Sequence, residues 1–478
     1  MAGMTITDQA RPRLFTGQHL PLVLGVIGLV TLGAFENRAV GTALPTMVRE
    51  FDALGSFGLA NAAPNASYLI SLAIAGLWSD RRGPIPTLRA GAISFALAQI
   101  LVGTATAMPM VIAGRLLSGL AEGLLDVSLV VLVARALPAV LRPRMFSLFA
   151  AMWILPSVLG PVLTGVVTEQ FGWRWVFLGA IVLLVPSWLL LGPAMRQSAT
   201  AEAPERSAED VAELEAWRAA LPWALAASVA LFSMTLAGDH LQAHPIICGT
   251  TVVVALAVLA RAAVRVMPAG TFVARCGFPA VVAVRALGGA AFAVSGAYLP
   301  LLLTLQHHFS PSKAGVTLSI TGVCWAFGSW LQGREHGIER VTVLRTGLAF
   351  MAIGLLVTSL LAWTDGTTWI GLIGWGLAGI GMGLSSSSLS VLTLDLSDHS
   401  NSGRNSSAGQ MAATMSIATG LAISGTLLAF NSDNPRPWVF GSIVTAGGVL
   451  ALLGFLAAPR CRRDRALESS GSSAVGQG

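Results

Sequence analysis

The sequence predicts an all-α integral membrane protein of about fourteen spanning helices, and three observations lead to this fold class. Hydrophobic residues make up 54% of the 478 residues, while charged residues make up 11%, against about 25% in a typical soluble domain. The mean hydropathy is +0.72, and apolar runs of roughly 18–25 residues recur along the chain. A soluble protein of this length could not bury so much apolar surface, so lipid is the expected solvent.

Polar, proline or glycine breaks separate the apolar runs, and each run is long enough to cross a bilayer as a helix. In order along the chain we place them at about 20–44, 60–78, 88–107, 109–132, 146–168, 174–193, 220–238, 246–264, 279–303, 314–332, 344–363, 368–392, 408–430 and 438–458.

The longest polar interruption, 194–219, contains six acidic residues and predicts a solvated linker or a short amphipathic helix between two bundles. The two runs after it are long and apolar, so we count them as spanning although they could lie at the surface. The predicted parts are an N-terminal tail 1–19, a six-helix bundle 20–193, the linker 194–219, two additional helices 220–264, a second six-helix bundle 279–458 and a basic, disordered tail 459–478.

The basic residues indicate how the helices are oriented. With the N-terminus inside, the predicted inner loops and tails hold 22 arginines, whereas the outer loops hold only Arg49, Arg174, Lys313 and Arg436. Cytoplasmic loops carry an excess of Lys and Arg, so we expect an even number of spans with both termini in the cytoplasm. The same distribution explains the net charge of +6 without a nucleic-acid partner.

The fourth run contains charges that a lipid-facing helix would avoid. Spacings of seven and four residues place Arg115, Glu122 and Asp126 on one helical face. Each charge costs about 2.5–3.5 kcal/mol at the centre of a membrane, so this face should meet another helix or a hydrated cavity. A structural ion pair between Arg115 and Glu122 and a role in proton or substrate handling are both open.

The first run contains Glu36 and Arg38, which are about 200° apart on a helix and cannot both line one cavity of a regular helix. By helical rise, Glu36 lies at a depth comparable with Arg115 and Glu122. We therefore predict that Glu36 faces a cavity near Arg115 and can carry protons, or is purely structural. Arg38 should point into a helix–helix seam or toward Glu122.

Other patterns are weaker or absent. Gln410 and Thr414 in the thirteenth run are possible cavity residues, or only bond to backbone. The four cysteines follow no metal-binding spacing, and the sequence has neither a Gly-rich phosphate loop with Lys nor a Ser/His constellation at membrane depth. We expect no cofactor, no metal and no enzymatic activity. The expected partners are the lipid bilayer, protons and a small amphiphilic substrate, with the chain acting as a monomer.

Several stretches together resemble the major facilitator superfamily, in particular its fourteen-helix drug:proton antiporters. They are Phe35-Glu36 through Leu44-Pro45, Gly76-Leu-Trp-Ser-Asp80-Arg81-Arg82-Gly83, Val111-Ile-Ala-Gly-Arg115-Leu-Leu-Ser-Gly119, Pro156 through Gly165, Phe171-Gly-Trp-Arg-Trp175, Tyr298 through Gln306, and Ala408 through Thr426. The resemblance covers about 20–458, and its strength lies in the order of these motifs along the predicted helices.

The resemblance implies a major-facilitator-type fold, with two six-helix bundles plus two extra helices around a central cavity, and proton-coupled export by alternating access. It implies that Glu36 corresponds to the family's acidic residue in the first helix. It implies that Arg115 corresponds to the family's arginine in the fourth helix, which is linked to proton handling. A cytoplasmic loop motif would latch the bundles, and an antiporter motif would form a kinked, small-faced helix. The first motif comprises Gly76, Asp80, Arg81 and Gly83, and the second comprises Gly160, Pro161 and Gly165.

The sequence departs from the family pattern at a few positions. Arg38 stands where the family usually has threonine, and Glu122 stands where a small residue is expected. Asp126 is expected near the Asp80 loop. The predicted function is a bacterial cytoplasmic-membrane antiporter that exports amphiphilic, drug-like compounds. The alternatives are a proton symporter or facilitator of a small metabolite, and a non-transporting membrane sensor on the same fold.

Overall fold

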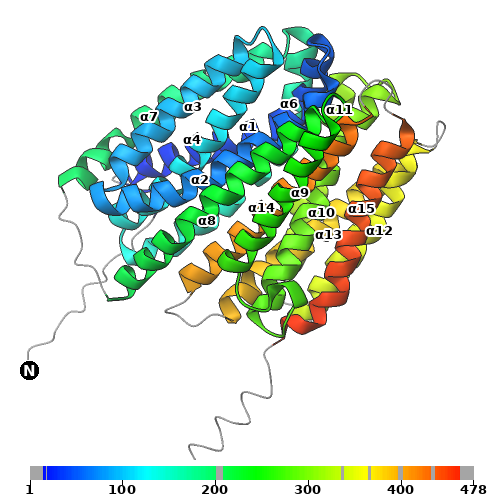
Figure 1. Ribbon diagram of the computed structural model, residues 1–478. Helices are drawn as coiled ribbons and strands as arrows, with labels where there is room; N and C mark the ends of the chain where they lie inside the picture. Colours follow the sequence, from blue (N-terminus) through cyan, green and yellow to red (C-terminus); the bar gives the residue numbers. More distant parts are fainter. Residues whose placement is uncertain are drawn as a thin grey trace, which may run out of the picture.

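The computed structural model describes residues 14–17, 19–200, 208–334, 338–363, 368–396, 402–431 and 436–462. They form long helices in two groups, with a further pair of helices beside them (Figure 1). The N-half consists of α1 (Leu20–Glu50), α2 (Phe57–Arg82), α3 (Pro84–Gly103), α4 (Met108–Ala136), α5 (Arg142–Ala151), α6 (Ile154–Gln170) and α7 (Arg174–Thr200).

The additional pair is α8 (Ala208–Asp239) and α9 (Pro245–Val266). The C-half consists of α10 (Phe278–Leu305), α11 (Pro311–Gln332), α12 (Arg340–Ser359), α13 (Thr368–Asp395), α14 (Ser402–Ala429) and α15 (Pro437–Ala457). Short 3-10 helices connect some of them: η1 (Leu54–Ser56), η2 (Ala139–Leu141), η3 (Thr271–Val273), η4 (Leu360–Ala362) and η5 (Ala458–Cys461).

Twelve helices in the described part of the chain are long and apolar enough to cross a membrane. The sequence predicts fourteen spans, and the two that do not meet this description are 60–78 and 146–168. The first lies in α2, which ends in the charged residues Asp80, Arg81 and Arg82. The second is divided between α5 and α6, neither of which has the length of a spanning helix. The structure therefore shows an all-helical membrane fold with twelve clear candidate spans.

The fifth predicted span, 146–168, is wrong as a single helix, because the chain breaks at Met152 and Trp153 between α5 and α6. Pro156 explains the position of the break. A proline has no backbone N–H, and its ring collides with the carbonyl oxygen four residues earlier, which here is that of Met152. Helix α6 continues through Pro161, and the kink that the resemblance implies there stays a prediction.

The linker predicted at 194–219 is shorter than expected in the described residues. Helix α7 continues to Thr200, and α8 already begins at Ala208. The acidic segment therefore belongs largely to the ends of two long helices, and residues 201–207 lie outside the described residues.

Proline sets the start of many helices. It occupies the first or second position of α1, α3, α4, α9, α10, α11 and α15. The N–H groups of a helix's first turn have no intrahelical partner, so proline loses nothing there and its fixed φ favours the helix. In α11 the Ser310 hydroxyl also accepts a hydrogen bond from the Lys313 N–H, at 3.4 Å.

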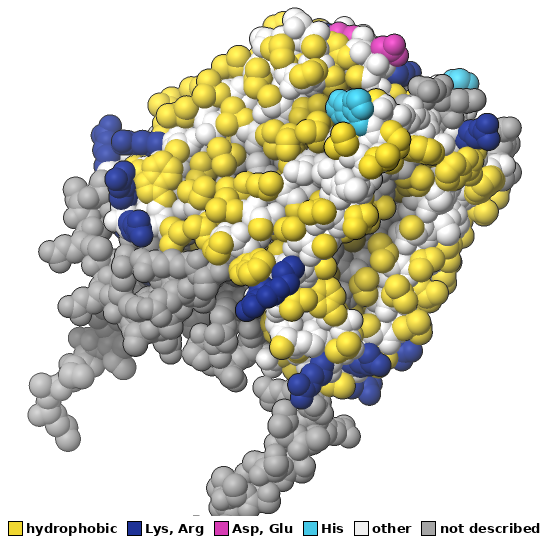
Figure 2. Space-filling model, viewed as in Figure 1, with side chains coloured by type: hydrophobic (Ala, Val, Ile, Leu, Met, Phe, Trp, Pro, Cys, Tyr) yellow, Lys and Arg dark blue, Asp and Glu magenta, His cyan; other side chains and the backbone are white. Residues whose placement is uncertain are grey.

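The outer surface has the character of a lipid-facing protein. Figure 2 shows hydrophobic side chains spread over most of the visible face, with most arginines near its borders. Exposed residues such as Val182, Leu189, Val253 and Ile373 lie on helices of all three groups. Apolar side chains in these positions contact lipid chains without cost.

The two halves pack on each other mainly at one end, where α6 and α11 meet (Figure 1). We call this end, which holds Glu50, Gln170 and Pro311, the closed end. The opposite end, which holds Arg82, Arg135 and Arg340, we call the arginine-rich end. One hydrophobic cluster joins the two halves through closed-end residues of the N-half, such as Val48 and Phe57. A separate cluster around Leu29, Leu129 and Leu191 is confined to the N-half and fills its arginine-rich end.

Glycines bring the halves into backbone contact at this seam. A Cβ on Gly165 of α6 would lie 2.6 Å from the carbonyl oxygen of Pro311, at the start of α11. In return, a Cβ on Gly315 of α11 would collide with the carbonyl oxygen of Pro161. Between α2 and α14, Gly58 and Gly425 approach so closely that neither has room for a side chain. Small residues allow such close helix packing in membranes.

The additional pair covers this seam on its α2 and α14 side. Helix α8 packs on both α2 and α14, and α9 packs on α8. At the closed end, the Ser56 hydroxyl before α2 donates to Asp239 Oδ2 of α8, at 2.7 Å. The Gln242 amide donates to the Phe430 carbonyl after α14, at 2.6 Å. The pair thus contacts both halves at the end where they are joined.

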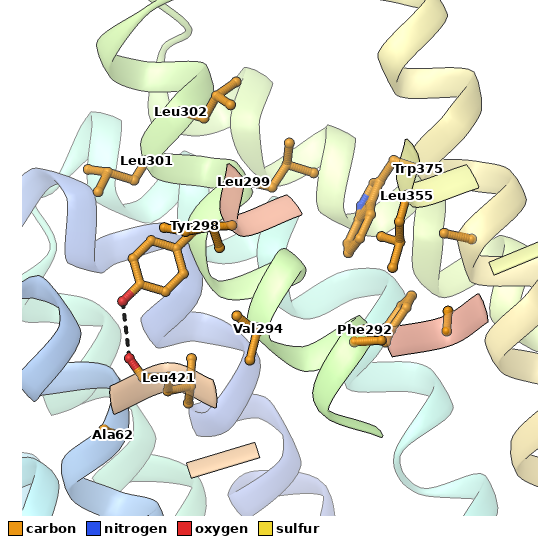
Figure 3. Packing of buried hydrophobic residues seen from close by; sticks show 14 of the residues in the cluster. Ala62, Phe292, Val294, Tyr298, Leu299, Leu301, Leu302, Leu355, Trp375 and Leu421 are labelled. Atoms are coloured by element: carbon orange, nitrogen blue, oxygen red, sulfur yellow. Dashed lines mark hydrogen bonds between the residues drawn. The ribbon is translucent and has the colours of Figure 1, made fainter. Parts of the chain in front are cut away.

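The C-half core is rich in aromatic residues (Figure 3). Phe292 of α10 stacks on Trp375 of α13, with ring centroids 5.1 Å apart and an interplanar angle of 9°. The Tyr298 hydroxyl donates to the Leu421 carbonyl of α14 at 3.3 Å, and the Tyr298 side chain is fully buried. These contacts fix α10 between α13 and α14.

The glycine seam yields a stability prediction. Gly315→Ala should lower the free energy of unfolding by about 1–3 kcal/mol, because the new methyl group cannot fit against the Pro161 carbonyl without moving the backbone. Thermal unfolding in detergent measures the effect. The matched control is Gly179→Ala in α7, where no atom lies within 4 Å of the added Cβ, so helix propensity should leave stability equal or higher. Equal melting temperatures for the two variants would contradict the close contact.

Candidate functional site

A buried ion pair joins the first and fourth helices of the N-half. The Arg115 guanidinium of α4 donates from Nη1 to Glu36 Oε1 of α1, and both side chains are at least nine-tenths buried. The same nitrogen lies 3.4 Å from the Ser118 hydroxyl, one turn along α4. The structure thus brings Glu36 to Arg115, as the sequence predicts, and pairs Arg115 with Glu36 instead of Glu122.

A small cavity lies beside this pair. Glu36, Ser118, Glu122 and Asp126 line it, together with Gly33 and Trp153 among others. Its volume is about 20 Å³, which is room for about one water molecule. The polar residues come from one face of α1 and one face of α4, and Trp153 comes from the break between α5 and α6.

Asp126 is held by a tyrosine of α2. The Tyr68 hydroxyl donates to Asp126 Oδ2 at 3.0 Å. Glu122 lies one turn away on the same face of α4, so both carboxyl groups lie in the same cavity as Glu36. The cluster therefore has three carboxyl groups and a single guanidinium, that of Arg115, among the described residues. If all were ionised, the excess negative charge would be costly at this depth.

Arg38 points away from these acids. Its guanidinium lies over the ring of Trp325 in α11, 5.4 Å from the centroid, and its Cβ lies beside Gly160 of α6. Of the two positions open to it from sequence, the structure therefore places it in a seam, between the N-half and the C-half. No ion pair of Arg38 is present among the described residues, and its Nε is buried without a partner.

The contact with Trp325 does not offset the free-energy cost of burying the Arg38 charge. A cation over an aromatic ring gains about 0.5–2 kcal/mol. A charge at mid-membrane costs about 2.5–3.5 kcal/mol on insertion scales. The stacking on Trp325 therefore does not replace a counter-ion.

The loop motif lies at the arginine-rich end. Gly83 ends α2 with φ of +79°, a conformation that favours glycine, and α3 begins directly after it. Arg81 is exposed, and a Cβ added to Gly76 would have no atom within 4 Å. The side chain of Asp80 lies outside the described residues, so the latch stays a prediction.

The antiporter motif lies in the seam between the halves. Gly160 faces Phe35 and Arg38 of α1, while Pro161 and Gly165 face the first turns of α11. Thr164, between them, is fully buried. The motif thus supplies the small surface on which the two halves meet.

Gln410 and Thr414 lie on α14 and are not brought to the acidic cavity. Gln410 is exposed and Thr414 is buried. Neither lines the cavity around Glu36. Their proposed part in a substrate cavity stays a prediction.

Three residues around these groups were not singled out from the sequence: Tyr68, Trp153 and Trp325. Tyr68 left a usable signal, because the chain has only two tyrosines and this one lies inside an apolar run. Trp153 and Trp325 left none, since tryptophan is common in this chain and either side of a helix can face lipid.

The buried pair yields a second prediction. Arg115→Gln should lower the free energy of unfolding by about 3–5 kcal/mol, because Glu36 is left as a buried charge without its partner. Combining it with Glu36→Gln should recover much of the loss, because neither member of the pair is then left as a charge without its partner. Equilibrium unfolding in mixed micelles, analysed as a double-mutant cycle, measures this coupling.

The control is the exposed pair of Glu50 and Arg174, whose side chains are 41% and 38% exposed. Exposed pairs contribute about 0–1 kcal/mol, so the same cycle on this pair should give a small coupling. Equal coupling energies in the two cycles would contradict a larger contribution of the buried pair to the free energy of unfolding.

Comparison with known proteins identifies the family of the chain. The sequence profile of the Major Facilitator Superfamily matches residues 26–334. Multidrug resistance protein 3 of Bacillus subtilis is 23% identical over 415 residues, which cover 85% of this chain and 79% of the relative. A probable multidrug-efflux transporter of Mycobacterium tuberculosis is 26% identical over 388 residues, which cover 79% and 81%.

Solved structures share the fold at low identity. An auto-inhibited POT family peptide transporter superposes with a TM-score of 0.65 at 13% identity, covering 93% of this chain and 98% of the other. A bacterial homolog of the human lysosomal transporter Spinster, in an inward-facing and unoccupied conformation, gives 0.63 at 14% identity over 93% and 98%. From its helical fold and the extent of the profile match, this chain is a membrane transporter that belongs to the Major Facilitator Superfamily.

Proposed function

We propose that the protein is a proton-coupled antiporter that exports amphiphilic, drug-like compounds by alternating access. The observation that carries the proposal is the cluster of three carboxyl groups and one guanidinium around a water-sized cavity in the N-half. Ionisable groups at membrane depth are costly and mark proton or substrate pathways. A carboxyl group in such a place can bind a proton from one side and release it to the other when access changes.

The arrangement of the cluster suggests how protons affect it. Protonation of Glu122 or Asp126 would remove like charge from the neighbourhood of the Glu36–Arg115 pair. Protonation of Glu36 itself would weaken that pair, which joins α1 to α4. Proton binding can therefore change how the helices of the N-half pack, and not only their charge.

The packing of the two halves supports alternating access. The halves share one hydrophobic cluster at the closed end, while the arginine-rich end of the N-half has its own. Because cytoplasmic loops carry the excess of arginine, we assign the arginine-rich end to the cytoplasm, with both termini there. This arrangement then corresponds to a state that is closed toward the outside of a bacterial cell membrane.

We also propose that α2 and the α5–α6 pair cross the membrane together with the twelve clear candidates, which makes fourteen spans. Both pack inside the N-half, α2 against α4 and α6 against α1, and α6 also meets α11 of the C-half. This number suits the fourteen-helix branch that the motifs resemble. The multidrug relatives support a drug-like cargo, since their names describe multidrug resistance and efflux.

The test is transport in proteoliposomes with an imposed pH gradient. Wild-type protein should move an amphiphilic dye against the direction of proton flow. Glu36→Gln and Glu122→Gln should each reduce this flux at least about tenfold, because each removes a titratable group from the cavity. The matched control is Glu339→Gln, an exposed acid paired with Arg462 at the arginine-rich end, which should transport normally.

The outcomes separate the alternatives. Dye export at full rate with the gradient collapsed would rule out proton exchange. Dye movement in the same direction as the protons would indicate a symporter. A folded protein that moves none of the tested dyes, with or without the gradient, would favour a sensor.

A further inference from the structure

The unpaired guanidinium of Arg38 is a group that the proton cluster does not use. It lies on α1 about 200° around the helix from Glu36, so the helix separates it from the acidic cavity. Glu36 itself is engaged by Arg115. An anion at Arg38 would therefore not be drawn into direct contact with the three carboxyl groups.

The surroundings of Arg38 supply an aromatic wall on one side and open space on another. Trp325 of α11 lies under the guanidinium, at 5.4 Å, and makes an edge contact with Phe292 at 5.7 Å. Phe292 continues the array to Trp375, as Figure 3 shows. On α1 itself, Gly41 lies one turn beyond Arg38 and has no atom within 4 Å of an added Cβ.

Some buried donors in this region lack acceptors. Nε of Arg38 has no hydrogen-bond partner among the described residues, and neither has the indole Nε1 of Trp375. Buried polar groups are normally hydrogen-bonded, and an exception suggests a partner that comes from outside the chain. A planar guanidinium matches a carboxylate or sulfonate with two parallel hydrogen bonds.

We propose that the seam between α1 and α11 binds the acidic group of an aromatic cargo, with Arg38 pairing with its carboxylate or sulfonate and Trp325 lying against its rings. The inference rests on the proposed function, since a transported molecule is what reaches a site between the halves. The cargo is then an anionic or zwitterionic aromatic amphiphile. A ligand held by Arg38 of the N-half and Trp325 of the C-half also favours conformations in which the two approach.

The experiment compares rhodamine B, which carries a free carboxylate, with its ethyl ester, which has the same rings without that charge. Binding of each dye to the full chain in lipid nanodiscs is measured by fluorescence polarisation, at one pH and without any gradient. Wild-type protein should bind the free acid at least about tenfold more tightly than the ester. Arg38→Gln should bring this ratio close to one by weakening only the acid, and Arg38→Lys should keep part of the preference.

Two further variants make the result specific. Trp325→Leu should weaken both dyes and leave their ratio high, which keeps the proposal testable if Arg38→Gln does not fold. The matched control is Arg345→Gln, which removes another stacked arginine, over Phe455, away from the seam and should leave both affinities unchanged. Equal affinity of wild-type protein for the two dyes, or no binding of either, would overturn the proposal, as would an unchanged ratio in Arg38→Gln.

Because the measurement needs no proton gradient, it separates the two proposals. If the protein binds the acid preferentially but shows no proton-driven flux, the antiporter proposal is rejected and the binding-site proposal stands. If the ester shows proton-driven flux and the two dyes bind equally well, only the binding-site proposal is rejected.

Discussion

The ion pair of Glu36 with Arg115 is the contact that allows buried charges inside the N-half. A charge inside a bilayer is costly, and it usually meets an opposite charge or a hydrated cavity. The pair joins the polar face of α1 to the polar face of α4, and the remaining acids of α4 border the same small cavity. Ser118 and Tyr68 complete the cluster with hydroxyl groups. The same ion pair thus links these two helices and contributes a carboxyl group to the cavity.

The interiors of the two halves differ in polarity. The N-half holds the buried acids, with space for about one water molecule, whereas the C-half is filled by stacked aromatic rings and leucines. Arg38 and Trp325 lie where these two environments meet. The aromatic core of the C-half is closely packed, and close-packed interiors resist deformation. In the proposed antiporter, the carboxyl groups that would bind protons lie in the N-half.

Glycines and prolines shape the surfaces at which the helices of the two halves meet. Gly165, Gly315 and Gly425 allow backbone contact between the halves at the closed end. The break before Pro156 brings Trp153 over the acidic cavity. The break between α5 and α6 thus lies beside the acids, and broken helices form binding sites in other transporters.

Much of this protein was predictable from local patterns. The length of the apolar runs indicates spanning helices because bilayer thickness sets that length. The spacing of Arg115, Glu122 and Asp126 indicates one helical face because the helical repeat is constant. Matching depth along two helices was enough to place Glu36 near Arg115. Each of these predictions depends on geometry within a single helix or on the thickness of the membrane.

Other features depended on which helices are neighbours, and no single-helix rule contains that information. The stacking of Arg38 on Trp325, the hydroxyl of Tyr68 on Asp126 and the place of α8 across α2 and α14 all join residues far apart in the chain. The break at Met152 and Trp153 was missed because Pro156 and Pro161 are equally able to interrupt a helix. Tertiary packing decided between them, since α6 at Pro161 is held against the backbone of α11, whereas the chain before Pro156 borders the cavity.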